Sequence, residues 1–522
     1  MMPHGKSGNL GDPEHFPQRG GIRSANPAKS GGEGTDGVLE VGSAHSRGNT
    51  PGNRSESQHQ EALEGADKDT QRDRETSTIH RGGETAVTKL ERIAKVARDN
   101  PHYKFTSLAS LLNEEYLAHC FSELKRDKAS GVDGVSVEAY GENLAENLHG
   151  LVEKMKRMQY RPQAVRRVYI PKENGAKRPL GIPAVEDKVV QMGMAKILEA
   201  IFEPQFLECS YGFRRGRSCH MALNRVDKVI MTKPINYIAD ADIKGFFDTV
   251  DHQWMIECLK QRIADRNFLR FIVRFLKSGI LEEGNYYETE QGTPQGGILS
   301  PILSNIYLHY VLDLWVEKKL KKECRGYVEE IRYADDFILC VQHKADGVRT
   351  LSALKQRLGK FGLELSEEKT RLIEFGRYAR ENATRREEKP ATFDFLGFTH
   401  YCDKTRRGYF KVGRQTSRKK YRQKRKAMTQ WLKTTRNVLS LPELWMLLRA
   451  KLVGHYRYYG VSGNYPRIAS YYSETIGSVF QWLNRRSQKK SFTWEQFRRY
   501  LERYPLPKPK LYYNLYTLAP AL

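Results

Sequence analysis

The sequence predicts an α+β fold behind a disordered N-terminal tail, and three observations lead to this expectation. Residues 1–86 are rich in Gly, Ser, Asn, Glu and Arg with Phe16 as the only aromatic residue, so burial cannot offset their ordering entropy. A β-rich centre, with apolar runs at 235–243 and 331–340, is flanked by helical patterns. After Tyr401 the pattern becomes helical and strongly basic.

The elements can be followed in order from Val87. Apolar residues recur at helical spacing over 87–97, and Asn100-Pro101 supplies a stop. A second helical stripe covers 144–155, and residues 166–183 read as two short strands around a turn at 173–175. Packing residues are expected in the C-terminal helices, namely Trp431, Leu432, Leu441, Leu444, Trp445 and Leu448.

The charge of the chain points to a polyanionic partner. The formal net charge is +25 over 522 residues, and residues 401–522 alone carry 27 Lys+Arg against 5 Asp+Glu. So uneven a distribution favours nucleic acid over a solvated basic surface. No membrane partner is expected, because the most apolar stretch, 298–315, is interrupted by Asn305, His309 and Asp313.

The cysteines and the N-terminus indicate the compartment. Seven cysteines are scattered without a CxxC pair, so neither a structural zinc site nor a disulfide framework is expected. No apolar signal segment stands at the N-terminus, which makes the bacterial cytoplasm or nucleoid the expected location.

Two acidic segments carry the residues best suited to chemistry. Asp335 and Asp336 stand in Tyr333-Ala334-Asp335-Asp336 within the apolar run 331–340, which is expected to be a strand and in which buried carboxylates require compensation of their charge. Asp240 and Asp242 alternate, so they share a face in an extended strand. Carboxylates from two strands suit a pair of divalent cations about 4 Å apart, as in phosphoryl transfer. Taken alone, the Asp335-Asp336 pair is equally explained by a turn, and Asp240 and Asp242 are better explained as exposed acids at a strand end.

A glycine-rich turn lies between the acidic segments, and a basic hairpin lies upstream. Residues 292–301 read GTPQGGILSP, where glycines permit close approach to a ligand and the Gln295 amide can hydrogen-bond a sugar or phosphate. Lys172 and Arg178 flank the turn at 173–175 and together suit a triphosphate. Without further context, the glycine-rich segment is equally an ordinary turn, and the basic hairpin is equally an exposed surface hairpin without a ligand.

The C-terminal region combines basic and aromatic residues. Residues 414–426 (RQTSRKKYRQKRK) hold eight basic residues in thirteen, a density that binds phosphates with strong salt dependence. Tyr456, Tyr458 and Tyr459 are candidates for stacking on unpaired RNA bases, and packing between helices is the alternative for two of the three.

Ten segments follow one another in a characteristic order. They are SGVDGV (130–135), YRPQAVRRVYIPK (160–172), RPLGIPAVEDKVVQ (178–191), YGFRRGRS (211–218), DADIKGFFDTVDH (240–252), GTPQGGILSPILSNIYL (292–308), YADD (333–336), LSEEKT (365–370), FLGF (395–398) and GHYRYYGVSGN (454–464). From about Lys89 to Leu511 the chain resembles the reverse transcriptases encoded by group II introns, the family of intron maturases. The last segment resembles the maturase-specific region.

The resemblance implies a metal site. Asp242, Asp335 and Asp336 match the three catalytic metal ligands, and Asp242 is preferred to Asp240 because it directly precedes Ile-Lys-Gly. Ile243 matches a residue that lends its backbone carbonyl to a metal. Two Mg²⁺ ions are implied, with Mn²⁺ as a substitute.

The resemblance also implies contacts with nucleotide and template. Phe247 matches the aromatic gate that rejects a ribose 2′-hydroxyl, with a core phenylalanine as the alternative. Lys369 matches the lysine near the leaving pyrophosphate, with a surface lysine as the alternative. Further matches are Lys172 and Arg178 for the triphosphate, Gln295 for the nucleotide pocket and Arg214 for template phosphates. The RNA-binding residues expected in the C-terminal region are Arg418, Lys419, Lys420, Arg422, Lys424, Arg425, Lys426 and Tyr456.

The chain departs from the family pattern at a few points. Arg215 stands where proline is usual and Thr249 where asparagine is common, which puts local loop geometry in doubt. The Cys- and His-bearing endonuclease domain of many relatives does not follow, so target-strand cleavage is not expected.

The implied fold is a right-hand polymerase, with fingers, a palm containing an antiparallel sheet, and a helical thumb. The expected divisions are a disordered tail (1–86), an N-terminal extension and fingers (87–235), a palm (236–400), and a basic helical thumb and maturase RNA-binding domain (401–522).

The implied function is RNA-directed DNA synthesis together with binding of intron RNA to promote splicing and mobility. The implied partners are intron RNA, an RNA template with a DNA primer, dNTPs and target DNA within a ribonucleoprotein; the sequence does not fix the oligomeric state. Two alternatives remain: the same polymerase recruited to DNA repair or phage defence without an intron, and a splicing-only RNA-binding factor.

Overall fold

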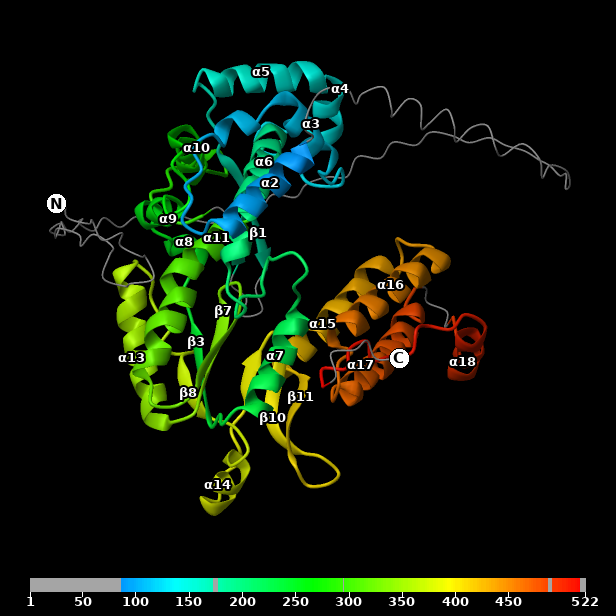
Figure 1. Cartoon of the computed structure of the whole chain (residues 1–522). Coiled ribbons are helices and arrows are strands. Elements are labelled where there is room, and N and C mark those ends of the chain that lie inside the picture. Colours follow the sequence, from blue (N-terminus) through cyan, green and yellow to red (C-terminus); the bar gives the residue numbers. More distant parts are fainter. Residues whose placement is uncertain (1–85, 172–176, 294, 487–490, 517–522) are drawn as a thin grey trace, which may run out of the picture. The chain divides into compact units, whose positions relative to one another are not determined.

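The computed structural model describes residues 86–171, 177–293, 295–486 and 491–516, and Figure 1 shows their helices and strands. The fold is α+β, with three sheets and a helical C-terminal region. The disordered tail expected at 1–86 lies outside the described residues apart from Ala86, as do Lys172 and the turn at 173–175.

The central sheet has the order β6-β7-β3-β8, and all its neighbouring strands are antiparallel. Helix α13 (Lys344–Lys360) contacts β3, β7 and β8, while α7 (Cys219–Thr232) contacts β6. Strand β7 is accordingly buried from Phe337 to Val341. The strands are β3 (Tyr237–Asp242), β6 (Val328–Tyr333), β7 (Asp336–Val341) and β8 (Arg371–Glu374).

A second sheet, β2-β1-β4-β5, lies with the N-terminal helices. Strand β1 pairs antiparallel with β2 and parallel with β4. The apolar helix α6 (Val185–Phe202) contacts α2 (Ala86–Asp99) and α3 (Glu114–Ser122) and forms the core of this region. The strands are β1 (Val165–Pro171), β2 (Lys177–Ile182), β4 (Ile280–Glu282) and β5 (Asn285–Tyr287). The other helices before β6 are η2 (Ala109–Leu111), α4 (Val137–Glu142), α5 (Leu144–Lys156), η3 (Glu203–Gln205), α8 (Phe246–Thr249), α9 (His252–Leu259), α10 (Arg266–Leu276), α11 (Ser300–Leu308), η4 (His309–Asp313), η5 (Val316–Leu320) and α12 (Lys321–Glu323).

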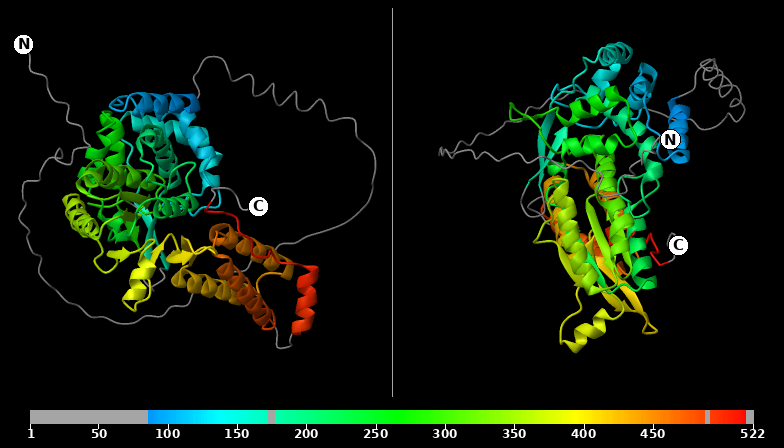
Figure 2. Two further views of the ribbon diagram at one scale, coloured as in Figure 1. Left: turned by 60° about the horizontal axis from the view of Figure 1, so that its bottom comes forward. Right: turned by 60° about the vertical axis from the view of Figure 1, so that its left-hand side comes forward.

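The third sheet, β11-β10-β9, leads into the C-terminal helices. Helix α17 (Tyr465–Leu483) contacts both α15 (Arg418–Thr435) and α16 (Leu441–Tyr459), and Figure 2 shows the three side by side. Side-chain caps mark the starts of two of these helices: Ser417 caps α15, and Ser440 forms a capping box with Glu443 at α16. The remaining elements are α14 (Ala379–Arg385), β9 (Phe393–Phe395), β10 (Phe398–Lys404), β11 (Phe410–Thr416) and α18 (Trp494–Arg503).

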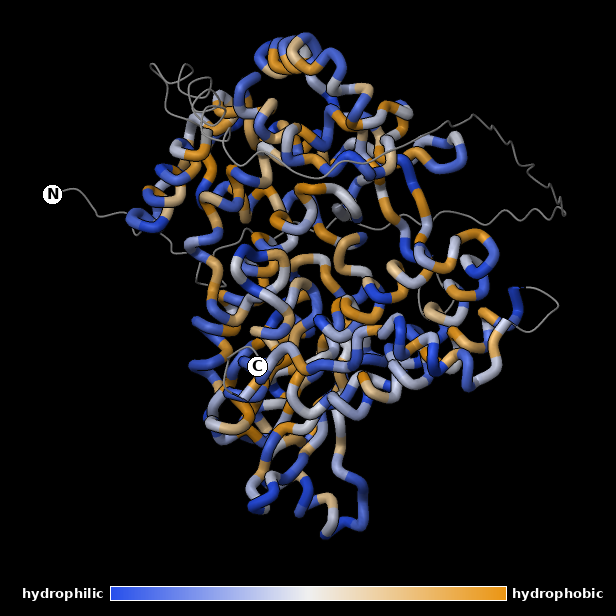
Figure 3. The backbone as a smooth tube through the Cα atoms, turned by 90° about the vertical axis from the view of Figure 1, so that its right-hand side faces the viewer, coloured by the Kyte–Doolittle hydropathy of each residue, from blue (hydrophilic) through white to orange (hydrophobic). Residues whose placement is uncertain are grey.

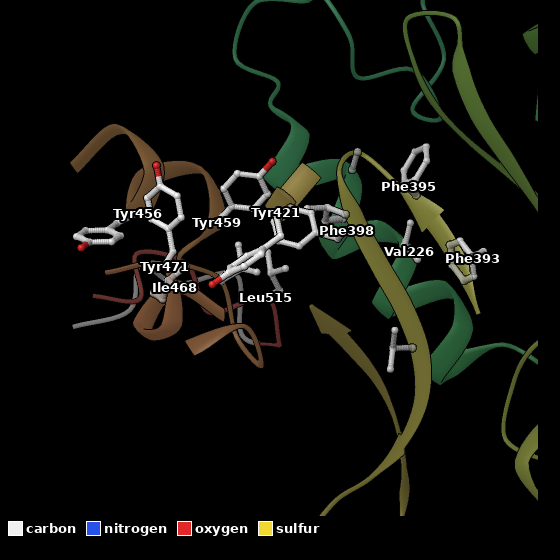
Figure 4. Close-up of a cluster of buried hydrophobic side chains, with 14 of the residues drawn as sticks. Val226, Phe393, Phe395, Phe398, Tyr421, Tyr456, Tyr459, Ile468, Tyr471 and Leu515 are labelled. Carbon is white, nitrogen blue, oxygen red and sulfur yellow. The ribbon is translucent and has the colours of Figure 1, made fainter. Parts of the chain in front are cut away.

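One hydrophobic cluster joins the third sheet to α7 and the C-terminal helices. Figure 4 shows Val226 of α7 near Phe393 and Phe398, with Tyr456 and Tyr471 on the C-terminal helices. Along the helices, hydrophobic and hydrophilic residues alternate within single turns, as Figure 3 shows. In the part of the chain that the structure describes, no helix combines the length and apolarity needed to span a bilayer.

The structure confirms several predicted elements and corrects two. The helix expected at 87–97 is α2, and the strands expected around 173–175 are β1 and β2. The run 331–340 is not one strand: β6 ends at Tyr333 and β7 begins at Asp336, so the acidic pair sits at a hairpin. The region after Tyr401 is not helical at once, because β10 and β11 extend the sheet to Thr416.

Candidate active site

The β3–β7 register brings the two acidic segments together. Asp242 lies directly opposite Asp336, and Tyr333 pairs with Asp336 across the β6–β7 hairpin. Because opposed residues of an antiparallel pair share a face, the Asp242 and Asp336 side chains emerge together. Asp335 belongs to the two-residue link between the strands. The three predicted metal ligands therefore meet at one end of the central sheet.

The link has an unusual backbone. Ala334 has a φ of 58°, a left-handed conformation that costs a side-chain-bearing residue energy. Two-residue hairpin links need such a conformation at their first position, where glycine or asparagine is common. The chain places alanine there, so neighbouring contacts must hold the turn.

The carboxylates repel one another. The pKa of Asp336 is raised to about 7, first by desolvation of the carboxylate at the hairpin and then by the charges of Asp335 and Asp240. Burial likewise raises the pKa of Asp335, with Asp242 adding to the effect and Arg178 opposing it. Such mutual repulsion is relieved when a cation is shared, and hard divalent cations prefer carboxylate oxygens. The donor set therefore fits Mg²⁺ or Mn²⁺, with Asp242, Asp335 and Asp336 as the residues that would hold it.

Lys369 supplies a positive charge on the other side of Asp242. Its Nζ lies 2.7 Å from Asp242 Oδ2, and both side chains are largely exposed. Asp240 is engaged elsewhere, 3.5 Å from the Arg371 guanidinium. Hydrogen bonds on either side of Ile243 join the Lys244 amide to Glu364 and the Ser366 amide to Asp242. Among the described residues no backbone hydrogen bond outside regular elements ends on the Ile243 carbonyl.

The glycine-rich turn docks on the helix that carries Phe247. The Thr293 amide donates to the Phe247 carbonyl over 2.7 Å, and Gly292 has a φ of 87°. A Cβ at Gly292 would lie 2.9 Å from the same carbonyl, so glycine is required for this approach. Phe247 is half-buried and packs edge-to-face on Phe246.

The same turn connects Gln295 to the basic hairpin. The Gly181 amide of β2 donates to the Gln295 carbonyl over 2.6 Å, and Gln295 Nε2 lies 3.5 Å from Asp248. Arg178, on β2, is exposed. Phe247, Gln295 and Arg178 therefore come from three segments tied by backbone hydrogen bonds.

A cavity of about 960 Å³ is lined by Asp336 and by residues of the C-terminal helices. Asp336 and Arg178 line one end, and Lys420 and Lys424 of α15 line the wall. Leu396 and Gly397 lie at the tip of the β9–β10 hairpin and also line it. Tyr458 Oη donates to the Leu396 carbonyl over 3.0 Å, which ties α16 to this hairpin.

The predicted basic run 414–426 is divided between two elements: Arg414 is buried in β11, paired with Asp227, and residues 418–426 form the first turns of α15. Of its seven Lys and Arg residues from Arg418 to Lys426, Lys420 and Lys424 line the cavity, while Arg418, Lys419, Arg422 and Lys426 are exposed without lining it. Arg425 lies 3.2 Å from Glu474 of α17.

Two predicted nucleic-acid contacts are wrong. Arg214 is 8% exposed, and its guanidinium bonds the Glu203 carboxylate and the carbonyls of Leu207 and Ser210. All its donors are used inside the protein, so it is a structural residue. Tyr456 is 1% exposed within the hydrophobic cluster, so its ring packs helices and does not stack on RNA bases.

The segment 454–464 is largely a structural junction. Asn464 is buried, accepts from the Thr416 amide over 2.7 Å and donates to the Tyr459 carbonyl over 2.8 Å. His455 stacks on Tyr471 with ring centres 3.8 Å apart. These contacts fix α16 and α17 to the end of β11.

Sequence reasoning missed the residues that support the hairpin. Arg332 is fully buried and bonds Asp313 and the Ala334 carbonyl. The available signal was a positive charge inside the apolar run 331–340. It also missed Lys451 and His455 on the cavity wall, and it gave Trp431, which lines the same wall, only as a packing residue.

Comparisons with known proteins agree with this geometry. Residues 170–400 match the family described as reverse transcriptase (RNA-dependent DNA polymerase). The chain is 33% identical over 353 residues to the group II intron-encoded protein LtrA of Lactococcus lactis subsp. cremoris. This alignment covers 56% of this chain and 58% of LtrA. The chain is also 32% identical over 323 residues to protein YkfC of Escherichia coli K12, in an alignment that covers 55% of this chain and 84% of YkfC.

A third relative, matched over a shorter stretch, is the uncharacterised 91 kDa protein in the cob intron of Schizosaccharomyces pombe. It is 34% identical over 240 residues, and the alignment covers 45% of this chain and 29% of that protein. The match spans less than two thirds of LtrA but most of YkfC. The matched region contains all three aspartates, Phe247 and Gln295. The chain belongs to the family of reverse transcriptases encoded by group II introns.

Proposed function

We propose that this chain is the RNA-directed DNA polymerase of a group II intron and that it binds the intron RNA to promote splicing and mobility. The observation that carries the proposal is the register that sets Asp242 opposite Asp336, with Asp335 beside them at the mouth of a basic cavity. The relative whose printed name says "group II intron-encoded" supports the intron role.

The chemistry proposed for this site is two-metal nucleotidyl transfer. Two bound Mg²⁺ ions would lower the pKa of the primer 3′-hydroxyl and neutralise charge on the leaving pyrophosphate. Asp242, Asp335 and Asp336 would hold these ions, and the Ile243 carbonyl would add a ligand. The protein's remaining task is to position the primer end and the nucleotide in line.

Residues around the acids would select the nucleotide. Arg178 and Lys172 bind the triphosphate, although Lys172 lies outside the described residues. Phe247 fills the space beside the sugar and excludes a 2′-hydroxyl, while Gln295 lines the pocket. Lys369, beside Asp242, is placed to donate to pyrophosphate oxygens.

The basic C-terminal region would hold the nucleic acids. Lys420 and Lys424 face the cavity that begins at Asp336, so the primer–template duplex is proposed to lie there. The exposed cations of α15 that do not line the cavity are proposed to bind intron RNA. The divisions proposed are fingers before residue 236, palm from 236 to 400, and thumb with maturase region from 401.

The test is Asp335→Asn, measured by DNA primer extension on an RNA template. We expect extension to be abolished, while binding and splicing of the intron RNA persist, because the substitution changes one metal ligand only. Asp394→Asn, at the exposed middle residue of β9, is the matched control and should extend at the wild-type rate. Near wild-type extension by the Asp335 variant would refute the assignment.

A second experiment addresses the intron role. Binding should favour the folded RNA that encloses the reading frame over bulk RNA at moderate salt. Equal affinity for both RNAs would be compatible with the proposed polymerase activity but would refute the proposal that the protein binds the RNA of its own intron.

A further inference from the structure

Arg332 lies beneath the acidic hairpin and uses every donor of its guanidinium there. Nε and Nη2 each donate to a carboxylate oxygen of Asp313 over 2.6 Å, and Nη2 also donates to Ser210 Oγ over 2.8 Å. Nη1 donates to Asn305 Oδ1 over 3.2 Å and to the Ala334 carbonyl over 2.9 Å. Arg332 and Asp313 are both fully buried, so this is an ion pair sealed from water.

The bond to the Ala334 carbonyl acts directly on the turn that carries the metal ligands. Ala334 holds the left-handed φ of 58°, and its carbonyl belongs to the peptide that leads into Asp335. A strained backbone persists only where its surroundings determine it. By fixing that carbonyl, Arg332 fixes the orientation of the Ala334–Asp335 peptide.

A second contact presses on the same turn from the segment before α7. Gly212 packs so closely that a Cβ on it would overlap the Ala334 amide nitrogen. The Tyr211 amide donates to the Arg332 carbonyl over 2.8 Å, and Asn305 Nδ2 donates to the Gly212 carbonyl over 2.8 Å. The turn is thus held between a guanidinium and a backbone segment.

The partner carboxylate comes from a helix that begins beside the nucleotide turn. Asp313 ends η4, a π-helical turn that directly follows α11, and α11 begins at the end of the GTPQGGILSP segment. Single π-turns inside helices occur frequently at functional sites. One continuous helical path therefore runs from the nucleotide turn to the ion pair under the metal ligands.

We infer that Arg332 and Asp313 are positioning residues for Asp335 and Asp336: their ion pair sets the geometry of the hairpin and thereby its affinity for divalent metal. The inference rests on the proposed function, in which these aspartates hold the metal. Supporting residues around metal ligands change metal affinity or activity by about 10- to 100-fold when they are replaced.

The same region offers an alternative that the contacts disfavour. Cys209, Asp313 and Glu330 are the one trio of potential ligand side chains in the described part of the chain whose ligand atoms all lie within 4.8 Å. Both Asp313 oxygens already accept from Arg332, so an ion there would sit against a guanidinium. Asp313 serves the hairpin rather than a second metal.

The decisive measurement is Mn²⁺ binding to the free protein, followed by electron paramagnetic resonance, beside thermal unfolding. For Asp313→Asn we expect Mn²⁺ affinity to fall by about tenfold or more. The half-saturating Mg²⁺ concentration for primer extension should rise by a similar factor. The matched control is Asp227→Asn, which breaks a second buried arginine–aspartate pair, with Arg414. It should lower the melting temperature and leave Mn²⁺ affinity within about twofold of wild type.

Gly212→Ala tests the inference without touching a charge. Its methyl group would displace the Ala334 backbone, so it too should weaken Mn²⁺ binding, and it decides the matter if Asp313→Asn does not fold. Wild-type Mn²⁺ affinity in a folded Asp313→Asn or Gly212→Ala protein would overturn the inference. A wild-type protein that binds Mn²⁺ but extends no primer would refute the proposed function instead, and the Mn²⁺ comparison among variants would still decide the positioning role.

Discussion

The Lys369 ammonium lies 2.7 Å from the Asp242 carboxylate, at the open end of the sheet where Asp242 faces Asp336. A cation of the chain itself therefore neutralises one of the three proposed metal ligands. Because both partners are largely exposed, the ion pair is weak and can exchange for a metal ion.

Removal of this ammonium should strengthen metal binding. In Lys369→Met, Mn²⁺ no longer competes with an ion pair, so affinity for the free protein should rise by no more than about fivefold, in line with an exposed pair. Mn²⁺ titration measures it. Lys244→Met is the control, because Lys244 pairs with Glu364 instead. Weaker Mn²⁺ binding by the Lys369 variant would show that the ammonium assists metal binding.

Phe247 should set the preference for deoxynucleotides. Its carbonyl is fixed by Thr293, so the half-buried ring has a defined place beside the nucleotide turn. Phe247→Val should raise use of rNTPs relative to dNTPs by about tenfold or more, since a smaller side chain admits a 2′-hydroxyl. Phe247→Tyr retains the ring and should retain selectivity. The kcat/KM ratio for the two nucleotides decides; an unchanged ratio in the valine variant makes Phe247 a core residue only.

The sequence pattern predicted the pairing of acids well but misplaced their local structure. The run 331–340 lacks the glycine or asparagine that marks a two-residue turn, so it read as one strand. The turn forms because Arg332 and Gly212 hold Ala334 from both sides. Contacts between segments more than a hundred residues apart cannot be inferred from local propensity.

Tyr456 illustrates the opposite case, in which the signal was present. Leu448, Leu452, Tyr456 and Tyr459 recur at helical spacing, and all are buried on one side of α16. Helical periodicity therefore favoured packing over RNA stacking. Arg214 gave no such signal, because its acceptors are mostly backbone carbonyls of the preceding loop.

Because Arg214 bonds only groups inside the protein, its replacement should change the stability of the fold and not the binding of the template. Arg214→Gln leaves Glu203 and two carbonyls without their donor, so the free energy of unfolding should fall by about 3 kcal/mol. Affinity for the template should not change in the folded protein. Arg215→Gln is the neighbouring control: Arg215 is 78% exposed in its ion pair with Glu199, so no more than about 1 kcal/mol is expected. Urea unfolding gives the free energies. A loss of template affinity without a loss of stability would instead support the original prediction that Arg214 contacts template phosphates.

His455 should make the C-terminal helices sensitive to acid. Burial lowers its pKa from 6.5 to about 3, and Lys424 acts in the same direction. Between pH 6.5 and 3 the imidazole of His455 is protonated in the unfolded chain but neutral in the folded chain. The contribution of buried His455 to the free energy of unfolding is therefore full above pH 6.5 and is lost as the pH falls toward 3. His455→Phe keeps a ring against Tyr471 but cannot be protonated. As the pH falls from 6.5 toward 3, its free energy of unfolding should fall less steeply than that of the wild type, and the two slopes should differ by about 1.4 kcal/mol per pH unit. Parallel curves for variant and wild type, from unfolding at several pH values, would contradict this.

The two sides of α15 should separate duplex binding from other charge effects. Lys420 and Lys424 line the cavity next to Asp336, whereas Arg422 and Lys426 are exposed outside it. A Lys420→Gln, Lys424→Gln double variant should weaken primer–template binding and reduce the slope of log affinity against log salt by about 0.9 per lysine.

The control, Arg422→Gln with Lys426→Gln, removes the same charge from the same helix. It should leave the salt slope for primer–template near the wild-type value, because its side chains do not face the proposed duplex. Equal losses in both double variants would mean that the duplex senses only the net charge of α15, and the cavity could then no longer be assigned as its binding site.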